Sequence, residues 1–117
     1  MPQQSVSDRL RAICLALPDA KEVVLRRGPT YRIADKIFAL DRRHAHGTAL
    51  WCKVPAGAQA ILIGADPVRF FSPPYYGTKG WIGLVLDGKT DWAEATALIR
   101  RSYRLVVPKK LAALAKE

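Results

Sequence analysis

The chain has 117 residues, of which 50% are hydrophobic and 25% are charged, so it is long enough for one packed domain and is not intrinsically disordered. Nineteen Lys and Arg against ten Asp and Glu give a net charge of +9, which favours a polyanionic partner such as nucleic acid. No apolar run approaches the roughly 20 residues of a membrane helix, and the N-terminal residues lack the apolar core of a signal peptide. We therefore expect one soluble, cytoplasmic, monomeric domain over residues 1–117, with no membrane partner.

The first half of the chain predicts a helix followed by an antiparallel meander. Residues 5–17 have helical hydrophobic spacing, with Ser5 or Ser7 as the cap and Pro18 as the end. Short strand patterns follow at residues 22–25, 30–33, 36–40 and 48–54. Ala34-Asp35 has the spacing of a two-residue hairpin turn.

The second half predicts helices around one clear strand. Residues 58–64 form a weaker helix, the prolines after Asp66 argue against a central strand there, and residues 81–88 form the last strand. Asp91 and Glu94 make a capping box that opens the strongest helix. After Pro108 the chain predicts a short terminal helix in KKLAALAK. The fold class is α+β in two layers, an antiparallel sheet with helices on one face, in the order α-β-β-β-α-β-α.

The two cysteines, Cys14 and Cys52, lie within apolar patterns far apart in the chain. We expect two buried, reduced thiols, and the sequence leaves open a bridge between them.

The segment DRRHAHG, residues 41–47, predicts a basic loop between two strands. Arg42 and Arg43 in such a loop can clamp phosphate oxygens, and the alternative is an exposed turn. His44 and His46 have no suitable third ligand nearby, so we expect no metal site.

The segment PPYYGTKG, residues 73–80, predicts a second wing-like loop. Tyr75 and Tyr76 offer stacking surface and Lys79 offers charge, as in nucleic-acid-binding proteins. The alternative is that Trp81 and one tyrosine pack in the core. Strand alternation would leave only one of the two tyrosines free.

Two further groups of cations remain open to interpretation. Lys53 shares a strand face with Trp51, opposite Leu50 and Cys52, and Lys36 comes close if the strands pair. These lysines can line a groove or simply cover apolar surface with their stems. On the last helix, one face can bind phosphates or simply be solvated; it carries Arg100, Arg101 and Arg104.

The sequence contains no P-loop, no dinucleotide-binding glycine motif and no nucleophile elbow. Its acidic residues are scattered singly, so no carboxylate pair for acid–base catalysis is visible. We therefore expect a protein that is not an enzyme and that needs no cofactor.

Motifs along nearly the whole chain resemble the MmcQ/YjbR-like family. They are CLALPDAKE, DKIFAL, WCKV, DPVRFFSPPYYGTKGWIGLVLD and LIRRSYRLVVPKKL, in this order and spacing. The resemblance implies an α+β domain similar to bacterial frataxin and secretion chaperones, and DNA binding through two wing-like loops. The matching positions are Lys36, Phe38, Lys53, Tyr75, Gly80, Trp81, Ser102 and Tyr103.

The chain departs from that family at one point, and its acidic residues do not fit the iron site of frataxin. Many relatives have Trp-Gly before the proline of the meander, whereas this chain has Arg27-Gly28-Pro29 with Arg26 ahead of it, which replaces an aromatic by charge. A frataxin-type iron site would need an acidic ridge near the first helix. Hard oxygen ligands are too few there, because basic residues are interspersed among the acidic ones.

The leading hypothesis is a DNA-binding module with weak sequence preference and strong salt dependence. Its expected contacts are Arg26, Arg27, Lys36, Arg42, Arg43, Lys53, Tyr75, Tyr76 and Lys79. One alternative is an adaptor that binds a protein partner at an edge strand or aromatic surface. The other is a small-molecule site around Lys36, Lys53, Tyr75 and Trp81.

Overall fold

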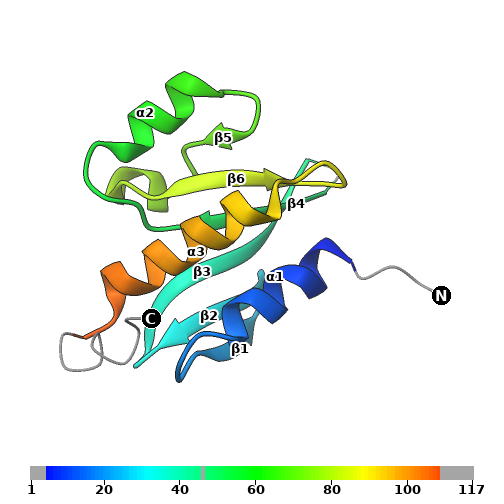
Figure 1. Ribbon diagram of the computed structural model, residues 1–117, viewed down its shortest axis with the longest axis vertical. Helices are drawn as coiled ribbons and strands as arrows, with labels where there is room; N and C mark the ends of the chain where they lie inside the picture. Colours follow the sequence, from blue (N-terminus) through cyan, green and yellow to red (C-terminus); the bar gives the residue numbers. More distant parts are fainter. Residues whose placement is uncertain (1–4, 46, 109–117) are drawn as a thin grey trace.

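The computed structural model describes residues 5–45 and 47–108, which fold into helices against a six-stranded antiparallel sheet (Figure 1). The elements are α1 (Val6–Leu15), β1 (Lys21–Leu25), β2 (Gly28–Ile33), β3 (Lys36–His44), β4 (Gly47–Cys52), α2 (Ala58–Ala65), β5 (Phe70–Phe71), a 3-10 helix (Tyr76–Lys79), β6 (Ile82–Leu86) and α3 (Trp92–Val106). The strand order in the sheet is β1-β2-β3-β4-β6-β5. The predicted α+β class is confirmed. Four strands precede α2 and β5 is additional, so the sheet has more strands than the predicted order.

Helices α1 and α3 lie across the same face of the sheet, whereas α2 lies beyond β6 beside β5 (Figure 1). The core forms under α1 and α3, where the ring of Tyr103 meets Phe38 edge-on at 5.4 Å. The buried Ser102 hydroxyl joins α3 to the sheet: it donates to the Phe38 carbonyl at 2.6 Å and accepts from the Lys53 N–H at 2.9 Å. Three of the eight positions matched to the family are therefore structural, namely Phe38, Ser102 and Tyr103.

Both well-capped helices begin where the sequence predicts. The Ser5 side chain accepts from the N–H of Asp8 and the Asp8 carboxylate accepts in return, so α1 has a full capping box. In α3 the Asp91 carboxylate accepts from the first-turn N–H groups. The capping box predicts that the Glu94 carboxylate accepts from the Asp91 N–H. This prediction is wrong, because the Glu94 carboxylate pairs with Arg69 from the segment before β5.

The predicted loop at residues 41–47 is wrong, because β3 continues through His44 and β4 begins at Gly47. Asp41 pairs with Leu50 and His44 pairs with Gly47, so this polar run continues the regular antiparallel pairing of β3 with β4. Position 46 lies outside the described residues. A sheet with one face free of helices accepts charged side chains along a strand, which is why a polar run misled the prediction.

The hairpin at Ala34-Asp35 is confirmed as a two-residue turn, with φ of 50° and 66°. The stretch after α2 holds the short edge strand β5, whose Phe71 pairs with Gly83 of β6. Pro73 follows this strand and lies outside the ladder, which fits its missing donor.

The remaining predictions concern the thiols, the membrane and the C-terminus. Cys14 and Cys52 are both free and buried, as predicted, so the bridge left open by the sequence does not form. None of the described helices is long and apolar enough to cross a membrane. The predicted terminal helix after Pro108 lies outside the described residues.

Candidate functional site

The face of the sheet opposite α1 and α3, which we call the open face, carries cations next to aromatic rings. Register pairs Arg42 of β3 with Ala49 of β4, and the guanidinium carbon of Arg42 lies 5.9 Å from the centre of the Trp51 ring. Leu50 and Cys52 flank Trp51 in sequence and belong to the core under the helices. The prediction that Trp51 faces away from them is therefore confirmed.

Tyr76 is the centre of an aromatic cluster on this open face. Its ring centroid lies 4.7 Å from that of Trp81, 5.2 Å from that of Tyr75 and 6.1 Å from that of Trp51. Trp81 at the base is 7% exposed, whereas Tyr75 is 68% exposed. The prediction that one tyrosine is free is confirmed. Trp81 is buried as expected, but it packs under Tyr76 and lies outside the core that α1 and α3 cover.

The two tyrosines differ in exposure for a reason other than strand alternation. Residues Tyr76–Lys79 form a 3-10 helix, and Tyr75 before it has a φ of 67°. The Gly77 N–H donates to the Pro73 carbonyl at 2.6 Å, and Gly80 ends the turn with a φ of 84°. The predicted wing is therefore a compact turn packed on the sheet.

Gln59 of α2 holds this turn in place. Its side-chain amide donates to the carbonyl of Gly77 at 2.9 Å and to that of Trp81 at 2.6 Å. Two bonds from one amide fix the start and the end of the segment that carries Lys79. Sequence reasoning missed Gln59, and a single glutamine on a weak helix gives no signal that would have revealed it.

A cavity of about 430 Å³ opens beside the aromatic cluster. It is lined by Arg32, Asp35, Lys36, Ile37, Lys53, Tyr76, Lys79, Trp81, Leu105 and Val106. The predicted proximity of Lys36 and Lys53 is confirmed, because both line it. Among the described residues that line it, Asp35 is the only one with a carboxylate. Within residues 5–45 and 47–108, the salt bridges join Arg11 to Glu22 and Arg69 to Asp66 and Glu94, so none neutralises the cations of the cavity.

The cations of the open face contact aromatic rings. The ammonium of Lys79 lies 4.5 Å from the centre of the Tyr75 ring and 5.7 Å from that of Tyr76, within range for cation–π attraction. Partial burial lowers the pKa of the Arg42 guanidinium, and the nearby positive charge of Arg27 adds to this effect. Arg42 and Lys79 therefore both place positive charge beside the aromatic cluster.

The remaining predicted contacts lie at the other end of the strands. Arg27 and Arg43 line a separate hollow with Gly28 and Thr48, and Arg26 is exposed in the turn between β1 and β2. Arg42 and Arg43 are consecutive strand residues and point to opposite faces. The structure therefore brings together Lys36, Lys53, Tyr75, Tyr76 and Lys79, with Arg42 nearby, and leaves Arg26, Arg27 and Arg43 outside the lining of the cavity.

His44 of β3 stacks on Phe71 of β5, with ring centroids 4.4 Å apart and planes 19° apart. Its partner in the predicted His pair, His46, lies outside the described residues. His44 therefore has a packing role at the far edge of the open face.

Gly28, between Arg27 and Pro29, has a backbone geometry that requires glycine. Its φ is 126°, and a Cβ at this position would lie 2.8 Å from the backbone oxygen of Asp41. The neighbouring Pro29 carbonyl accepts from the Arg42 guanidinium at 3.4 Å. The glycine is required by the close approach of β3, while the preceding position is free to carry charge.

Comparisons with known proteins agree on the family. A family model described as YjbR matches residues 15–105. The crystal structure of the Deinococcus radiodurans protein DR2400, described as a DUF419 domain, is similar with a TM-score of 0.77 and 26% identity, over 94% of this chain and 83% of that chain. No curated protein matches the sequence. The family match spans both the helix-side core and the open face.

Proposed function

The chain belongs to the YjbR family, and on that premise we propose that it binds DNA through the open face of its sheet, mainly by phosphate contacts. One observation carries the proposal: the cavity beside the aromatic cluster combines Arg32, Lys36, Lys53 and Lys79 with a single carboxylate. Unpaired cations around a concave surface create a field that attracts a polyanion.

The aromatic cluster favours single-stranded over duplex DNA. Tyr75 is 68% exposed at the edge of the cavity, and Lys79 lies over its ring. An exposed ring beside a cation can stack against an unpaired base. A base inside a duplex is already stacked between its neighbours and cannot reach the ring. We therefore propose that Lys36, Lys53 and Lys79 contact phosphates while Tyr75 stacks on a base.

This proposal replaces the two-wing arrangement that the resemblance implied. Residues 41–44 belong to β3, so Arg42 is proposed to act from the open face itself. Arg26, Arg27 and Arg43 lie at the far end of the strands and would contribute only to the general positive field. The proposal includes no catalytic step, since Asp35 in the cavity lining has no second carboxylate beside it there.

Fluorescence anisotropy with a labelled single-stranded oligonucleotide across a salt series tests the proposal. Removing two phosphate contacts with Lys36→Gln and Lys53→Gln is expected to reduce the slope of log K against log salt by about 1.4, at about 0.7 per contact. The matched control is Lys89→Gln with Arg101→Gln, which removes the same charge from exposed sites outside the cavity lining. Equal losses in the two double variants would mean that binding reflects net charge alone.

A free nucleotide in the same cavity is a second candidate, because a volume of about 430 Å³ is within the range of small-molecule sites. It predicts thermal stabilisation by a mononucleotide that short DNA does not displace. Stabilisation by mononucleotide together with unchanged oligonucleotide binding in the Lys36→Gln, Lys53→Gln variant would favour this second function.

A further inference from the structure

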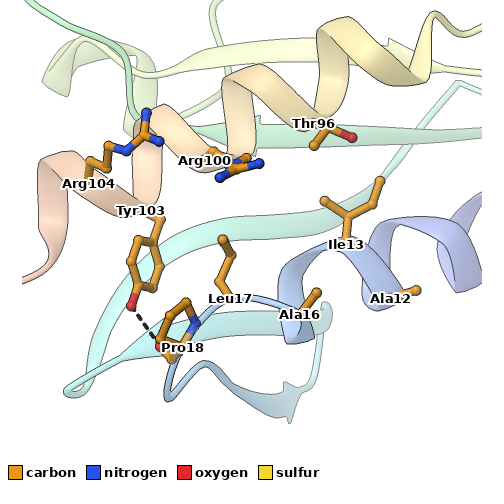
Figure 2. A pocket seen from close by; sticks show the side chains of 9 residues that line it. All are labelled: Ala12, Ile13, Ala16, Leu17, Pro18, Thr96, Arg100, Tyr103 and Arg104. Atoms are coloured by element: carbon orange, nitrogen blue, oxygen red, sulfur yellow. Dashed lines mark hydrogen bonds between the residues drawn. The ribbon is translucent and has the colours of Figure 1, made fainter. Parts of the chain in front are cut away.

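A second cavity, which we call the helix groove, lies between α1 and α3 on the side of the molecule remote from the open face. Its volume is about 510 Å³ (Figure 2). On the α1 side, Ala12 and Ala16 have small side chains that leave room for the groove, and Ile13 and Leu17 form its apolar walls. Pockets of this size are typical of small-molecule sites. The groove is thus mainly apolar along α1 and the residues that follow it.

One end of the groove is closed by Tyr103, which points from α3 toward Pro18 in Figure 2. Its hydroxyl donates to the Pro18 carbonyl at 2.7 Å, so this polar group is already satisfied. Tyr103 is only 2% exposed and packs on Phe38, which makes this end rigid. The closed end therefore offers apolar surface to a ligand.

The α3 side of the groove carries two guanidinium groups, those of Arg100 and Arg104. They are four residues apart, so they share one helix face, and both are exposed. Neither forms a salt bridge with any residue in the described ranges 5–45 and 47–108. At the closed end, burial raises the pKa of the Tyr103 hydroxyl, and the negative charge of Asp19 adds to this effect. Two like charges beside an apolar floor complement one anionic group attached to an apolar body.

We propose that the helix groove binds a small amphipathic carboxylate, with its head between Arg100 and Arg104 and its apolar body along Ile13 and Leu17. Guanidinium groups bind carboxylates through paired charge-assisted hydrogen bonds, and the apolar body would displace water from the floor. A long polyanion such as DNA is expected to bind this groove less well than the cavity beside the aromatic cluster, because most residues that line the groove are apolar and cannot pair with phosphate. The proposal is independent of DNA binding, because none of the residues that line the helix groove lines the cavity proposed for DNA.

The test is a titration of the full 15N-labelled chain with sodium octanoate, followed by NMR chemical shifts. We expect saturable shifts at residues of α1 and α3 that line the groove. Each buried methylene contributes a factor of about four, so hexanoate, which is two methylenes shorter, is expected to bind about fifteenfold more weakly than octanoate. 1-Octanol tests the head group, and we expect it to bind more weakly because it cannot pair with the arginines.

Three variants separate this site from general hydrophobic adsorption. Arg100→Gln with Arg104→Gln is expected to weaken octanoate binding by about tenfold through loss of charge-assisted bonds. Arg101→Gln is the matched control, since Arg101 follows Arg100 but does not line the groove, and binding should stay within about twofold of that of the unchanged chain. Ala12→Trp should abolish binding by filling the groove, and Ala12→Leu provides a milder filling if the tryptophan disturbs the spectrum of the folded chain.

Three results would overturn the proposal. They are shifts scattered over the surface without saturation, equal weakening by Arg101→Gln, and 1-octanol binding as tightly as octanoate. DNA binding by the Arg100→Gln, Arg104→Gln variant is measured in parallel. Loss of octanoate binding with DNA binding retained separates this site from the one on the open face.

Discussion

The two faces of the sheet both bury a large aromatic side chain, but they do so in different ways. On the helix side, Phe38 and Tyr103 are at most 2% exposed, and Ser102 beside them satisfies two backbone groups. On the open face, Trp81 is 7% exposed, yet its cover is Tyr76 and a turn held by Gln59. The first arrangement stabilises the fold. The second shapes a surface, so burial of an aromatic residue alone does not identify the core.

The largest expected effect separates these two roles. Phe38→Ala should destabilise the protein by about 3–5 kcal/mol, because it leaves a cavity under α3. Tyr76→Ala should cost about 1–2 kcal/mol, since that ring is half-buried, while weakening binding of single-stranded DNA. Urea unfolding and DNA anisotropy measure the two effects. Equal stability losses would contradict the division between a structural face and a binding face.

Ser102→Ala is expected to have the next largest effect, about 2–3 kcal/mol. The substitution leaves the Phe38 carbonyl and the Lys53 N–H without the partner that joins them to α3. Tyr103→Phe, which removes a single bond to Pro18, should cost only about 1 kcal/mol in the same urea experiment. A loss for Ser102→Ala no larger than that of Tyr103→Phe would show that water replaces the hydroxyl.

Gln59→Ala should cost about 1 kcal/mol of stability, yet it should weaken DNA binding several-fold. The amide fixes the segment that presents Tyr75 and Lys79 without touching the proposed ligand. Amide hydrogen exchange of residues 76–81 should become faster. Ile61→Gln, at a 72% exposed position on the same helix, is the matched control. Unchanged DNA binding by Gln59→Ala would show that the turn at residues 76–81 does not take part in DNA binding.

The smallest expected effect is a pH dependence on the helix side of β3. Burial raises the pKa of Asp41, so the folded state holds this proton more tightly than the unfolded chain does. Ionisation therefore costs stability at neutral pH, and the cost disappears as the pH falls below the unfolded pKa of the carboxyl. Asp41→Asn should be more stable than the unchanged chain at pH 7, with the gap closing near pH 3. The Ser7 hydroxyl and the charge of Arg42 both favour the ionised carboxylate. A variant that is less stable at pH 7 would show that these two interactions outweigh burial.

Local patterns predicted much of the fold. The cap residues Ser5 and Asp91 and the turn at Ala34-Asp35 follow from neighbouring residues, and they are confirmed. The extension of β3 through Arg42 and Arg43 was missed, because a charged run resembles a loop unless one face of the sheet is known to be open. The pairing of Glu94 with Arg69 spans 25 residues and has no local signature.

The candidate site was only partly predictable for the same reason. Alternation placed Trp51 and Lys53 on one face, but it could not say that the helices cover the other face. Lys36, Lys53, Tyr76 and Lys79 were predicted and line one cavity, whereas Arg32 and Gln59 were missed. Both missed residues act through long-range contacts: Arg32 reaches the cavity through strand register, and Gln59 through the packing of α2.

The most direct test of the account is an NMR titration of the 15N-labelled chain with a short single-stranded oligonucleotide near physiological salt. The account predicts shifts at Arg32, Lys36, Arg42, Lys53 and residues 75–81 and at Leu105 and Val106, which line the same cavity, with little change along α1 and the rest of α3. Shifts concentrated on Arg100, Arg101 and Arg104, or at the turns holding Arg26 and Ala45, would place the interface elsewhere and contradict binding through the open face.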